Sequence, residues 1–331
     1  MSMVSHGHDL AVHTLEDPDA LWLDGSDIVE SLSRTPRRIP SYYGYDATGS
    51  ELFDRITDLP EYYLTSTEYR LLEEHGGDIA DRAGCEWVVE LGSGSAKKTR
   101  LLLAEMVRRR ATTFLPIDVS QDMLESSSRA VRRHVPGLAV TGLVGRWEAG
   151  LDWVAEHREG PCLVVFLGSG LGNMLPDERR ALLKRLAAFS RPGDQLLVTA
   201  DFEKPIEELE RAYNEPPGSD LWGRFRTNRL VVLNRLFDGD FALERYYERC
   251  HYDPRTATIE ARVYASEPQW VTLRKLGLEL DLARGESIVV DYSFKFLRPN
   301  LVAELEGYGF RPEGEWVNGL RQYGVFLLRR R

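Results

Sequence analysis

The residues best suited to bind a cofactor form one short stretch, Glu90-Leu91-Gly92-Ser93-Gly94. An apolar run from Trp87 to Leu91 stops at these glycines, and an amphipathic helical pattern follows from Thr99, which predicts a strand, a tight turn and a helix. Glycines let the backbone pass close to a ligand, and the N-terminus of the next helix offers unpaired N–H groups. The stretch therefore predicts a turn that holds a nucleotide cofactor.

Two features of this turn distinguish between cofactors. A dinucleotide fingerprint has a third glycine three residues after the second, whereas this chain has Lys97 there and Lys98 beside it. Glu90 places a carboxylate where the ligand would lie, which suits a cationic ligand better than a pyrophosphate. S-adenosylmethionine (SAM), with its sulfonium and amino groups, fits this pattern. A plain glycine-rich loop in an α/β domain is the alternative from this stretch alone.

Three further strand ends carry residues that could contact a ligand. Asp118 ends the second predicted strand, where an acid can accept both ribose hydroxyls or can cap the following helix. Arg146 and Trp147 end the third, where Trp147 can stack on a base or lie half-buried in an interface. Gly168–Asn173 ends the fourth, and Asn173 can offer a donor and an acceptor to a small polar substrate, or can serve only as a loop or capping residue.

A regular alternation of strands and helices brings these strand ends together. Strand-like runs occur at Trp87–Leu91, Thr113–Ile117, Leu138–Val144, Leu163–Leu167 and Gln195–Thr199. Helical patterns lie between them at Thr99–Arg109, Gln121–His134, Glu148–His157 and Pro176–Ala188. This order predicts an α/β fold with a doubly wound parallel sheet, in which ligands bind beyond the carboxyl ends of the strands.

The pattern changes on either side of this sheet. Before it, Asp27–Ser33 indicates a helix, an aromatic-rich stretch from Pro40 to Thr67 is more typical of core than of site, and Thr65 with Glu68 forms a capping box that would open a helix. After residue 200 the predicted elements are a helix at Phe202–Tyr213, a turn at 214–218, strands at Thr258–Tyr264, Gln269–Leu273 and Glu286–Tyr292, a helix at Leu301–Tyr308 and a strand at Gly324–Arg329. The last two could complete the first sheet, which would make residues 201 to about 290 an insertion.

The composition limits the class of protein and its compartment. The 331 residues are 43% hydrophobic and 28% charged, enough for one large or two modest domains. A formal net charge of -10 argues against a nucleic-acid binder, which needs clustered surplus Lys and Arg. Three cysteines without metal-ligand spacing predict a reducing compartment and no metal site, and no apolar run is long enough to span a membrane. We therefore expect a cytoplasmic protein with neither a nucleic-acid nor a membrane partner.

Several ordered motifs are similar to those of one known family, the SAM-dependent histidine Nα-methyltransferases of ergothioneine biosynthesis, with their fungal relatives that methylate a prenylated tryptophan. The resemblance runs from about Tyr45 to Arg331, nearly the whole chain. The motifs that carry it are Tyr45-Asp46-Ala47-Thr48-Gly49-Ser50-Glu51-Leu52-Phe53-Asp54, Leu59-Pro60-Glu61-Tyr62-Tyr63, Glu90-Leu91-Gly92-Ser93-Gly94, Phe166-Leu167-Gly168-Ser169-Gly170-Leu171-Gly172-Asn173 and Ser293-Phe294-Lys295-Phe296.

The resemblance implies a Rossmann-like class I methyltransferase sheet and a second, smaller α+β substrate-binding domain. The implied division gives residues 1–62 and 201–290 to the substrate-binding domain, 63–200 to the SAM-binding domain, and 291–331 to the completion of that SAM-binding domain.

The resemblance, together with the strand ends, also implies residue roles. The predicted SAM contacts are Glu90, Gly92, Gly94, Lys98, Asp118, Arg146, Trp147, Gly168 and Ser169. The predicted amino-acid contacts are Tyr45, Tyr62, Asn173, Tyr213, Ala261, Asp291 and Ser293. Tyr62, Asn173 and Tyr213 would hold the carboxylate and the α-amino group. Asn173 and Tyr45 would lie at the reacting amine, and Asp291 and Ser293 would grip the imidazole.

Three positions depart from the family pattern. The acid of the ring site is Asp291 in place of a Glu, a ring-lining Met is replaced by Ala261, and the acid expected near the adenine is Arg146. The first two changes enlarge the ring pocket. A larger ring such as indole or phenol could therefore fit.

The reaction that the resemblance implies is SAM-dependent Nα-methylation of a free aromatic amino acid, with histidine, converted to trimethylhistidine, as the leading substrate. A neutral amine attacks the sulfonium methyl in line and the thioether leaves, so most of the rate gain comes from holding the two groups aligned. Tryptophan or tyrosine as substrate, and a non-catalytic SAM-binding module, are the alternatives. An NAD oxidoreductase is opposed by Lys97, and a nucleic-acid or protein methyltransferase by the lack of an Asn/Asp-Pro-Pro-aromatic motif after the fourth strand. We expect a monomer.

Overall fold

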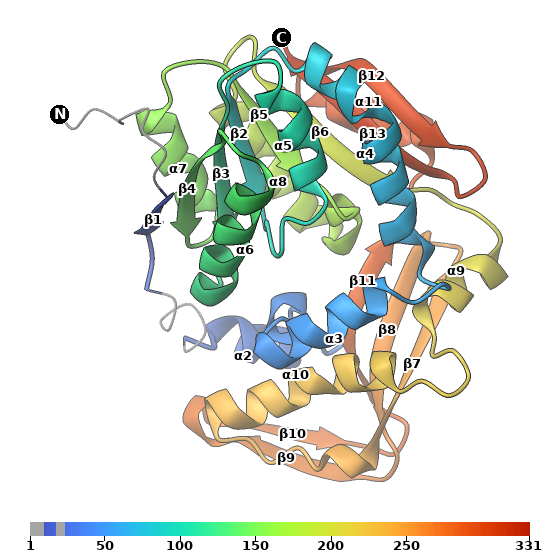
Figure 1. Cartoon of the computed structure of the whole chain (residues 1–331). Coiled ribbons are helices and arrows are strands. Elements are labelled where there is room, and N and C mark those ends of the chain that lie inside the picture. The colour runs from blue at the N-terminus through green and yellow to red at the C-terminus, as the bar shows by residue number, and fades with distance from the viewer. Residues whose placement is uncertain (1–9, 18–23) are drawn as a thin grey trace.

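One large sheet forms the centre of the computed structural model, which describes residues 10–17 and 24–331 (Figure 1). Eight strands pair in the order β1-β4-β3-β2-β5-β6-β13-β12. Their bounds are β1 (Leu10–Thr14), β2 (Trp87–Leu91), β3 (Thr113–Asp118), β4 (Ala139–Val144), β5 (Cys162–Phe166), β6 (Gln195–Asp201), β12 (Phe310–Asn318) and β13 (Tyr323–Arg330). Neighbouring strands from β1 to β6 run parallel, whereas β13 runs antiparallel to both β6 and β12. The predicted α/β sheet is confirmed, and its last two strands make it mixed.

Helices cover both faces of this sheet because its strands are apolar on both sides. Successive residues of a strand point to opposite faces, so Val88 joins one core cluster and Val89 the other. The first cluster receives apolar side chains from α4 (Tyr63–Arg82), α5 (Thr99–Val107) and α6 (Gln121–His134). The second receives them from α7 (Trp147–His157), α8 (Pro176–Phe189) and α11 (Arg298–Gly307). This is the layering of a doubly wound fold.

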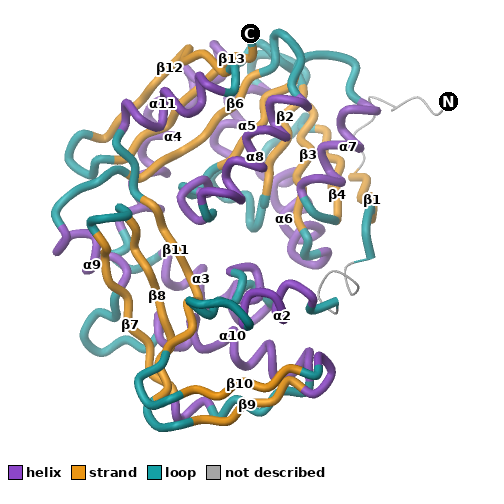
Figure 2. Tube along the Cα trace, turned by 180° about the vertical axis from the view of Figure 1, so that it is seen from behind, coloured by secondary structure: helices purple, strands orange, loops and turns teal. Residues whose placement is uncertain are grey.

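A second part of the molecule lies beyond the carboxyl ends of the parallel strands (Figures 1 and 2). Its core is a three-stranded antiparallel sheet, β11-β8-β7, with a two-stranded sheet, β9-β10, at its far end. The strands are β7 (Tyr246–Asp253), β8 (Thr258–Ala265), β9 (Gln269–Leu273), β10 (Leu278–Leu282) and β11 (Ser287–Phe294). The helices are α2 (Ser26–Leu32), α3 (Ala47–Thr57), α9 (Ile206–Tyr213) and α10 (Leu221–Phe237), with the 3-10 turn η1 (Ser41–Gly44). An N-terminal segment and a later internal segment, far apart in the sequence, thus meet here.

The chain returns from this part to the large sheet beside β6. The backbone N–H of Phe296 donates to the carbonyl of Asp201 at 3.1 Å. The helix α11 follows and packs on the sheet, and β13 then pairs with β6. The predicted completion of the sheet by the C-terminal elements is therefore confirmed. The domain boundaries stay a prediction, to which the structure adds that β1, within the predicted segment 1–62, pairs with β4.

Some elements differ from the sequence-based expectations. The helix predicted at Phe202–Tyr213 begins only after Pro205, at Ile206, because proline is accepted at a helix start and not inside one. Elements that were not predicted include β1, β7, β12, α3 and α10. Within the described residues, no helix has the length and apolar character needed to cross a membrane.

Candidate active site

The turn between β2 and α5 is open on the side where a ligand would lie. Gly92 and Gly94 have φ angles of 64° and 47°, a region that glycine adopts at little cost. A Cβ at either position would meet no atom within 4 Å. The N–H groups of Gly92 and Ser93 donate to the carbonyl of Ile117, at 2.9 and 3.2 Å. The turn is therefore fixed against β3 and leaves free space above it.

Glu90 is the charged group beneath this turn. Its side chain is buried, one carboxylate oxygen accepts a hydrogen bond from the Thr99 hydroxyl, and the other oxygen has no partner. Burial raises the pKa of Glu90 to about 8, although the Thr99 hydrogen bond and the charge of Lys98 oppose the shift. A buried acceptor without a partner is costly, so this carboxylate fits a ligand that brings a donor or a positive charge.

Asp118 joins the ends of two neighbouring strands. One of its oxygens accepts from the N–H of Gly94 at 2.9 Å, and the other accepts from the N–H of Ser120 at 3.0 Å. The N-cap of α6 is Ser120, whose hydroxyl accepts from the N–H of Met123. The alternative of a helix-capping role thus belongs to Ser120. Burial raises the pKa of Asp118, against the effect of these backbone hydrogen bonds.

Glu68 is a site residue that the sequence analysis missed. The capping box predicted at Thr65 and Glu68 is wrong, since α4 begins at Tyr63 and has no side-chain cap. Glu68 is buried, and its two oxygens accept from the Lys98 ammonium at 2.6 Å and the Gly168 N–H at 2.8 Å. Its place among apolar residues on one face of α4 was the available signal, because an acid on a buried helix face needs partners.

The loop after β5 has a strained backbone beside this carboxylate. Gly168 and Ser169 have φ angles of 71° and 55°, and such a conformation is uncommon for serine. The Ser169 N–H donates to the Thr199 hydroxyl at 3.0 Å, which in turn donates to Glu68 at 3.0 Å. Glu68 therefore holds the loop in place, directly at Gly168 and at Ser169 through Thr199.

Arg146 and Trp147 lie at the start of α7. Arg146 is largely exposed and forms an ion pair with Glu16, at 2.8 Å, just after β1. An acid thus does lie near this strand end, supplied by the N-terminal segment. Trp147 is half-buried and packs against the core cluster on the α7 and α8 face. The roles of both residues in cofactor binding stay predictions.

One pocket brings together all the predicted amino-acid contacts. These residues are Tyr45, Tyr62, Asn173, Tyr213, Ala261, Asp291 and Ser293. Gly168, a predicted SAM contact, also lines the pocket, and the lining residues that were not predicted are Phe53, Trp222, Arg226, Ile259 and Tyr292. Gly168 belongs to the loop that Glu68 holds, so the pocket begins where the predicted cofactor site ends.

The wall of the pocket on β8 and β11 depends on a β-bulge. Asp291 lies opposite Ala261, and Ser293 lies opposite Ile259, after a register shift between Val289 and Asp291. Because alternate residues share a face, the shift places both polar side chains on the pocket side. A bulge commonly re-aims side chains in this way.

Aromatic rings form another part of the pocket lining. The ring of Tyr62 packs edge-on against Tyr213 and Trp222, with centroids 5.7 and 5.6 Å away. Burial raises the pKa of Tyr62 and of Tyr213 well above the usual tyrosine value. Both hydroxyls therefore stay protonated and can donate hydrogen bonds to a bound anion.

Asp291 is not a free carboxylate. Arg229, which is fully buried on α10, donates to it at 3.2 Å. Burial raises the pKa of Asp291, and the charge of Arg229 opposes this shift. The pair leaves Asp291 as a hydrogen-bond acceptor whose charge is balanced.

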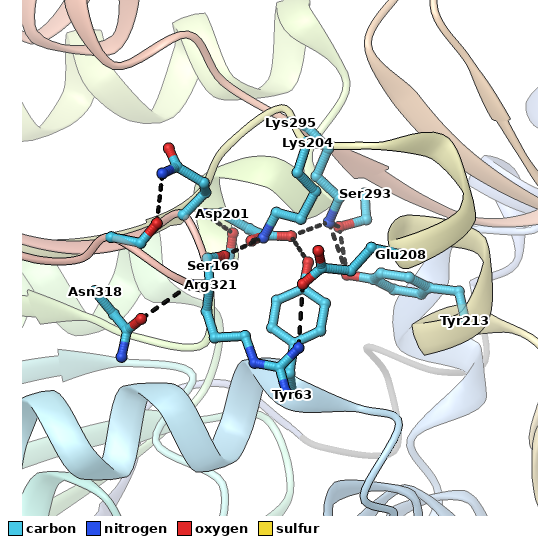
Figure 3. Close-up of polar contacts among 12 residues, drawn as sticks. Tyr63, Ser169, Asp201, Lys204, Glu208, Tyr213, Ser293, Lys295, Asn318 and Arg321 are labelled. Carbon is cyan, nitrogen blue, oxygen red and sulfur yellow. Dashed lines mark hydrogen bonds and ion pairs between the residues drawn. The ribbon is translucent and has the colours of Figure 1, made fainter.

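The floor of the pocket connects to a buried polar network (Figure 3). Lys295 donates to the hydroxyls of Tyr213 and Ser293, both at 2.8 Å, and forms an ion pair with Asp201 at 2.9 Å. Lys204 and Tyr63 also contact Asp201, at 2.5 and 2.7 Å. Two pocket hydroxyls are thus anchored to a charged group behind them.

Comparisons with known proteins agree with this geometry. The model of a family described as histidine-specific methyltransferase, SAM-dependent, matches residues 24–330. A histidine N-alpha-methyltransferase from Mycolicibacterium smegmatis is 37% identical over 306 residues, which cover 91% of this chain and 93% of that protein. One from Mycobacterium tuberculosis is 36% identical over 321 residues, with 96% and 98% covered. An L-tryptophan methyltransferase from Psilocybe serbica is 26% identical, with 91% of each chain covered.

The match of the family model spans nearly the whole described chain, and the bacterial relatives share more than a third of its residues over almost their full length. The sheet order, the open glycine turn and the adjoining polar pocket are those of an enzyme that brings a nucleoside cofactor to a small substrate. The chain belongs to the family of SAM-dependent, histidine-specific methyltransferases.

Proposed function

We propose that this enzyme methylates the α-amino group of free histidine and continues to trimethylhistidine (hercynine), a step of ergothioneine-type biosynthesis. The observation that carries the proposal is the convergence of seven predicted contacts, from distant segments, on one pocket that shares Gly168 with the cofactor loop. The names of the bacterial relatives support histidine as the substrate.

The residues of the glycine turn fit SAM, which when bound supplies an electrophilic methyl group on a sulfonium. Glu90 offers a buried oxygen without a partner, which suits the cationic end of this molecule. Asp118 would accept hydrogen bonds from the ribose hydroxyls. The free space above Gly92 and Gly94 would let the ligand lie close to the backbone. A bound cation would favour the ionised form of Glu90, which would then balance the charge of the sulfonium end.

The pocket residues would orient the amino acid. Tyr62 and Tyr213 would donate to its carboxylate, which selects a free amino acid over a peptide. Asn173 and Tyr45 would contact the α-amino group, and Asp291 and Ser293 would accept hydrogen bonds from ring N–H groups.

Positioning is the main contribution of these residues to the rate. The Asn173 amide oxygen would accept an amine N–H and so aim the nitrogen lone pair at the methyl carbon. Alignment of two reacting groups contributes up to about 7–11 kcal/mol. The nearby positive charge of a sulfonium lowers the pKa of the amine, so the neutral nucleophile forms without a dedicated base. Bound SAM would supply the methyl group with loss of its C–S bond and would leave as the neutral thioether, and each charged amine product would release a proton to solvent before the next transfer.

A second candidate substrate is tryptophan or tyrosine. Ala261 leaves room where a larger side chain would reduce the ring pocket. Asp291 forms an ion pair with Arg229. A fungal relative named as an L-tryptophan methyltransferase supports this alternative.

The test is to incubate the purified enzyme with SAM and an equimolar pool of free amino acids, and to identify methylated products by mass spectrometry. We expect mono-, di- and trimethylated histidine. Asn173→Ala and a reaction without SAM are the controls. Methylated tryptophan or tyrosine without methylated histidine would support the second candidate. SAM binding without any product would point to a non-catalytic SAM-binding module.

We further propose that the enzyme is a cytoplasmic monomer that acts on a small molecule and needs no nucleic acid. The net charge of -10 supports the last point. Light scattering after size exclusion tests the oligomeric state, and a dimeric mass would contradict it.

A further inference from the structure

Lys295 is a buried cation with all of its hydrogen bonds inside the protein. Its side chain is fully buried, and its three partners are Asp201 at 2.9 Å and the hydroxyls of Tyr213 and Ser293 at 2.8 Å (Figure 3). An ammonium group donates three hydrogen bonds and accepts none. Both hydroxyls therefore act as acceptors towards Lys295.

This arrangement restricts the two hydroxyl protons. The oxygens of Tyr213 and Ser293 lie 2.9 Å apart, so one hydroxyl donates to the other. Only one proton of the pair is then left for a ligand, and both residues line the pocket. Burial and the charge of Asp201 raise the pKa of Tyr213, which keeps its hydroxyl protonated beside the lysine.

We propose that Lys295 is a positioning residue for the α-carboxylate of the substrate, acting through Tyr213 and Ser293. The inference rests on the proposed function, in which the substrate is a free amino acid. A hydroxyl that accepts from an ammonium group is a stronger donor to its own acceptor, because hydrogen bonds in a chain polarise one another. An anion at Tyr213 selects one arrangement, in which Ser293 donates to Tyr213 and Tyr213 donates to the anion.

The same arrangement connects the two ends of the substrate. When Ser293 donates to Tyr213 and accepts from Lys295, one lone pair of its oxygen remains to accept a hydrogen bond from the ring of the substrate. Asp291, also an acceptor, lies two residues away on the same face of β11. The carboxylate of the substrate thus fixes the direction of the Ser293–Tyr213 hydrogen bond, which leaves the ring site with acceptors for N–H groups. An amine without a carboxylate would not fix this direction.

Lys204 provides a matched control for Lys295. It is also a buried lysine bound to Asp201, at 2.5 Å, but its other contacts are the Arg321 carbonyl and the Tyr63 ring. It does not line the pocket. Replacing it removes a buried cation of the same kind and leaves the hydrogen bonds of Lys295 in place.

The experiment compares histidine with histamine, the same molecule without its carboxylate, as substrates for the full-length enzyme. For Lys295→Met we expect the KM for histidine to rise roughly 10- to 100-fold, the effect of losing a hydrogen bond to a charged group. The KM for histamine, kcat for histidine and the Kd for SAM should change little, so the preference for histidine over histamine falls. Lys204→Met should keep this preference.

The outcomes separate the inference from the function on which it rests. If the wild-type enzyme fails to methylate histidine, the proposed function fails. If the wild-type enzyme is active and folded Lys295→Met keeps the wild-type KM, or loses activity equally on histidine and histamine, the positioning role is wrong. If Lys295→Met does not fold, Tyr213→Phe keeps the lysine and breaks its path to the pocket. An unchanged preference for histidine in that variant would overturn the proposal.

Discussion

The two halves of the site differ in how their buried ionisable groups are paired. On the cofactor side, beneath the open turn, one carboxylate oxygen of the buried Glu90 has no hydrogen-bond partner. On the substrate side the buried cations Arg226, Arg229 and Lys295 are each paired with an acid. A cationic methyl donor would find the oxygen without a partner, whereas the carboxylate of an amino acid would find the neutral hydroxyls of the pocket. Hydrogen bonding, as well as shape, therefore distinguishes the two ligands.

The halves also differ in how they are assembled. The cofactor half uses neighbouring strand ends of one sheet, whereas the pocket draws on segments between Tyr45 and Ser293. A variant in one half should therefore change the binding of one ligand and leave the binding of the other unaltered.

The largest selective loss is expected for Asp118→Ala. The variant removes the acceptor for Gly94 and the predicted acceptor for the ribose, so the Kd for SAM should rise about 100-fold, at the upper end for hydrogen bonds to a charged group. The KM for histidine at saturating SAM should stay within about twofold, since Asp118 does not line the substrate pocket. Calorimetry measures the first and initial rates the second. Asp122→Ala, an exposed acid on α6, is the control.

Ala261→Met should increase the selectivity for histidine, because the longer side chain reduces the volume of the ring pocket. We expect the ratio of kcat/KM for histidine to that for tryptophan to rise about 30-fold, in the range that a few methylene groups produce in a pocket. Competition between the two amino acids measures this ratio. Ile259→Met, on the same wall and with little change in volume, should leave it nearly unaltered. A ratio that falls in Ala261→Met would contradict the placement of the ring.

Tyr62→Phe should weaken substrate binding and leave cofactor binding unchanged. The loss of one donor to the carboxylate should raise the KM for histidine about 10-fold, with an unchanged Kd for SAM. Tyr247→Phe, an exposed tyrosine on β7, serves as the control. Equal losses for histidine and SAM would mean that Tyr62 supports the fold rather than the carboxylate.

The smallest effect is a pH dependence confined to the cofactor half. Because burial raises the pKa of Glu90 to about 8, the folded protein holds a proton that the unfolded chain releases. Its contribution to stability is present below the ordinary pKa of a glutamate and is lost as the pH rises towards 8. A cation favours the ionised form, so SAM affinity should rise about fivefold between pH 7 and 8 through the titration of this group.

Glu90→Gln is the matched variant for this titration. It keeps the shape of the side chain and removes its ionisation, so the unfolding free energy and the SAM affinity should both lose this pH dependence. Thermal unfolding without ligand and SAM titration across the range measure the two effects. The same slope in Glu90→Gln would assign the dependence to another group.

The sequence predicted the central sheet well because its signals are local. Apolar runs that end in glycine mark β2 and β5, and the structure places these strands within a residue of the prediction. The strand-end rule then brings Asp118 and Gly168 to the same edge of the sheet. The resemblance to a known family supplied the rest of the pocket, since nothing local relates Tyr62 to Asp291.

One element that escaped prediction, α10, buries polar residues. α10 has no simple apolar face, because Arg226 and Arg229 are as buried as the neighbouring leucines and find acids on other segments. Glu68 was misread for the same reason, since its partners Lys98 and Gly168 are far away in the chain. Pairing between distant residues decides both cases, and amphipathic patterns contain no information about it.

The β-bulge at Val290 has an evolutionary consequence. If the same residues paired on from Val289 without a bulge, Val290 would lie opposite Ala261 and Tyr292 opposite Ile259, and Asp291 and Ser293 would turn to the opposite side of the sheet. Lineages of this enzyme can therefore change substrate by replacing side chains on β11. Removal of Val290 would end the bulge and leave Asp291 opposite Ala261, whereas a further residue before Asp291 that no bulge accommodates would exchange the whole wall.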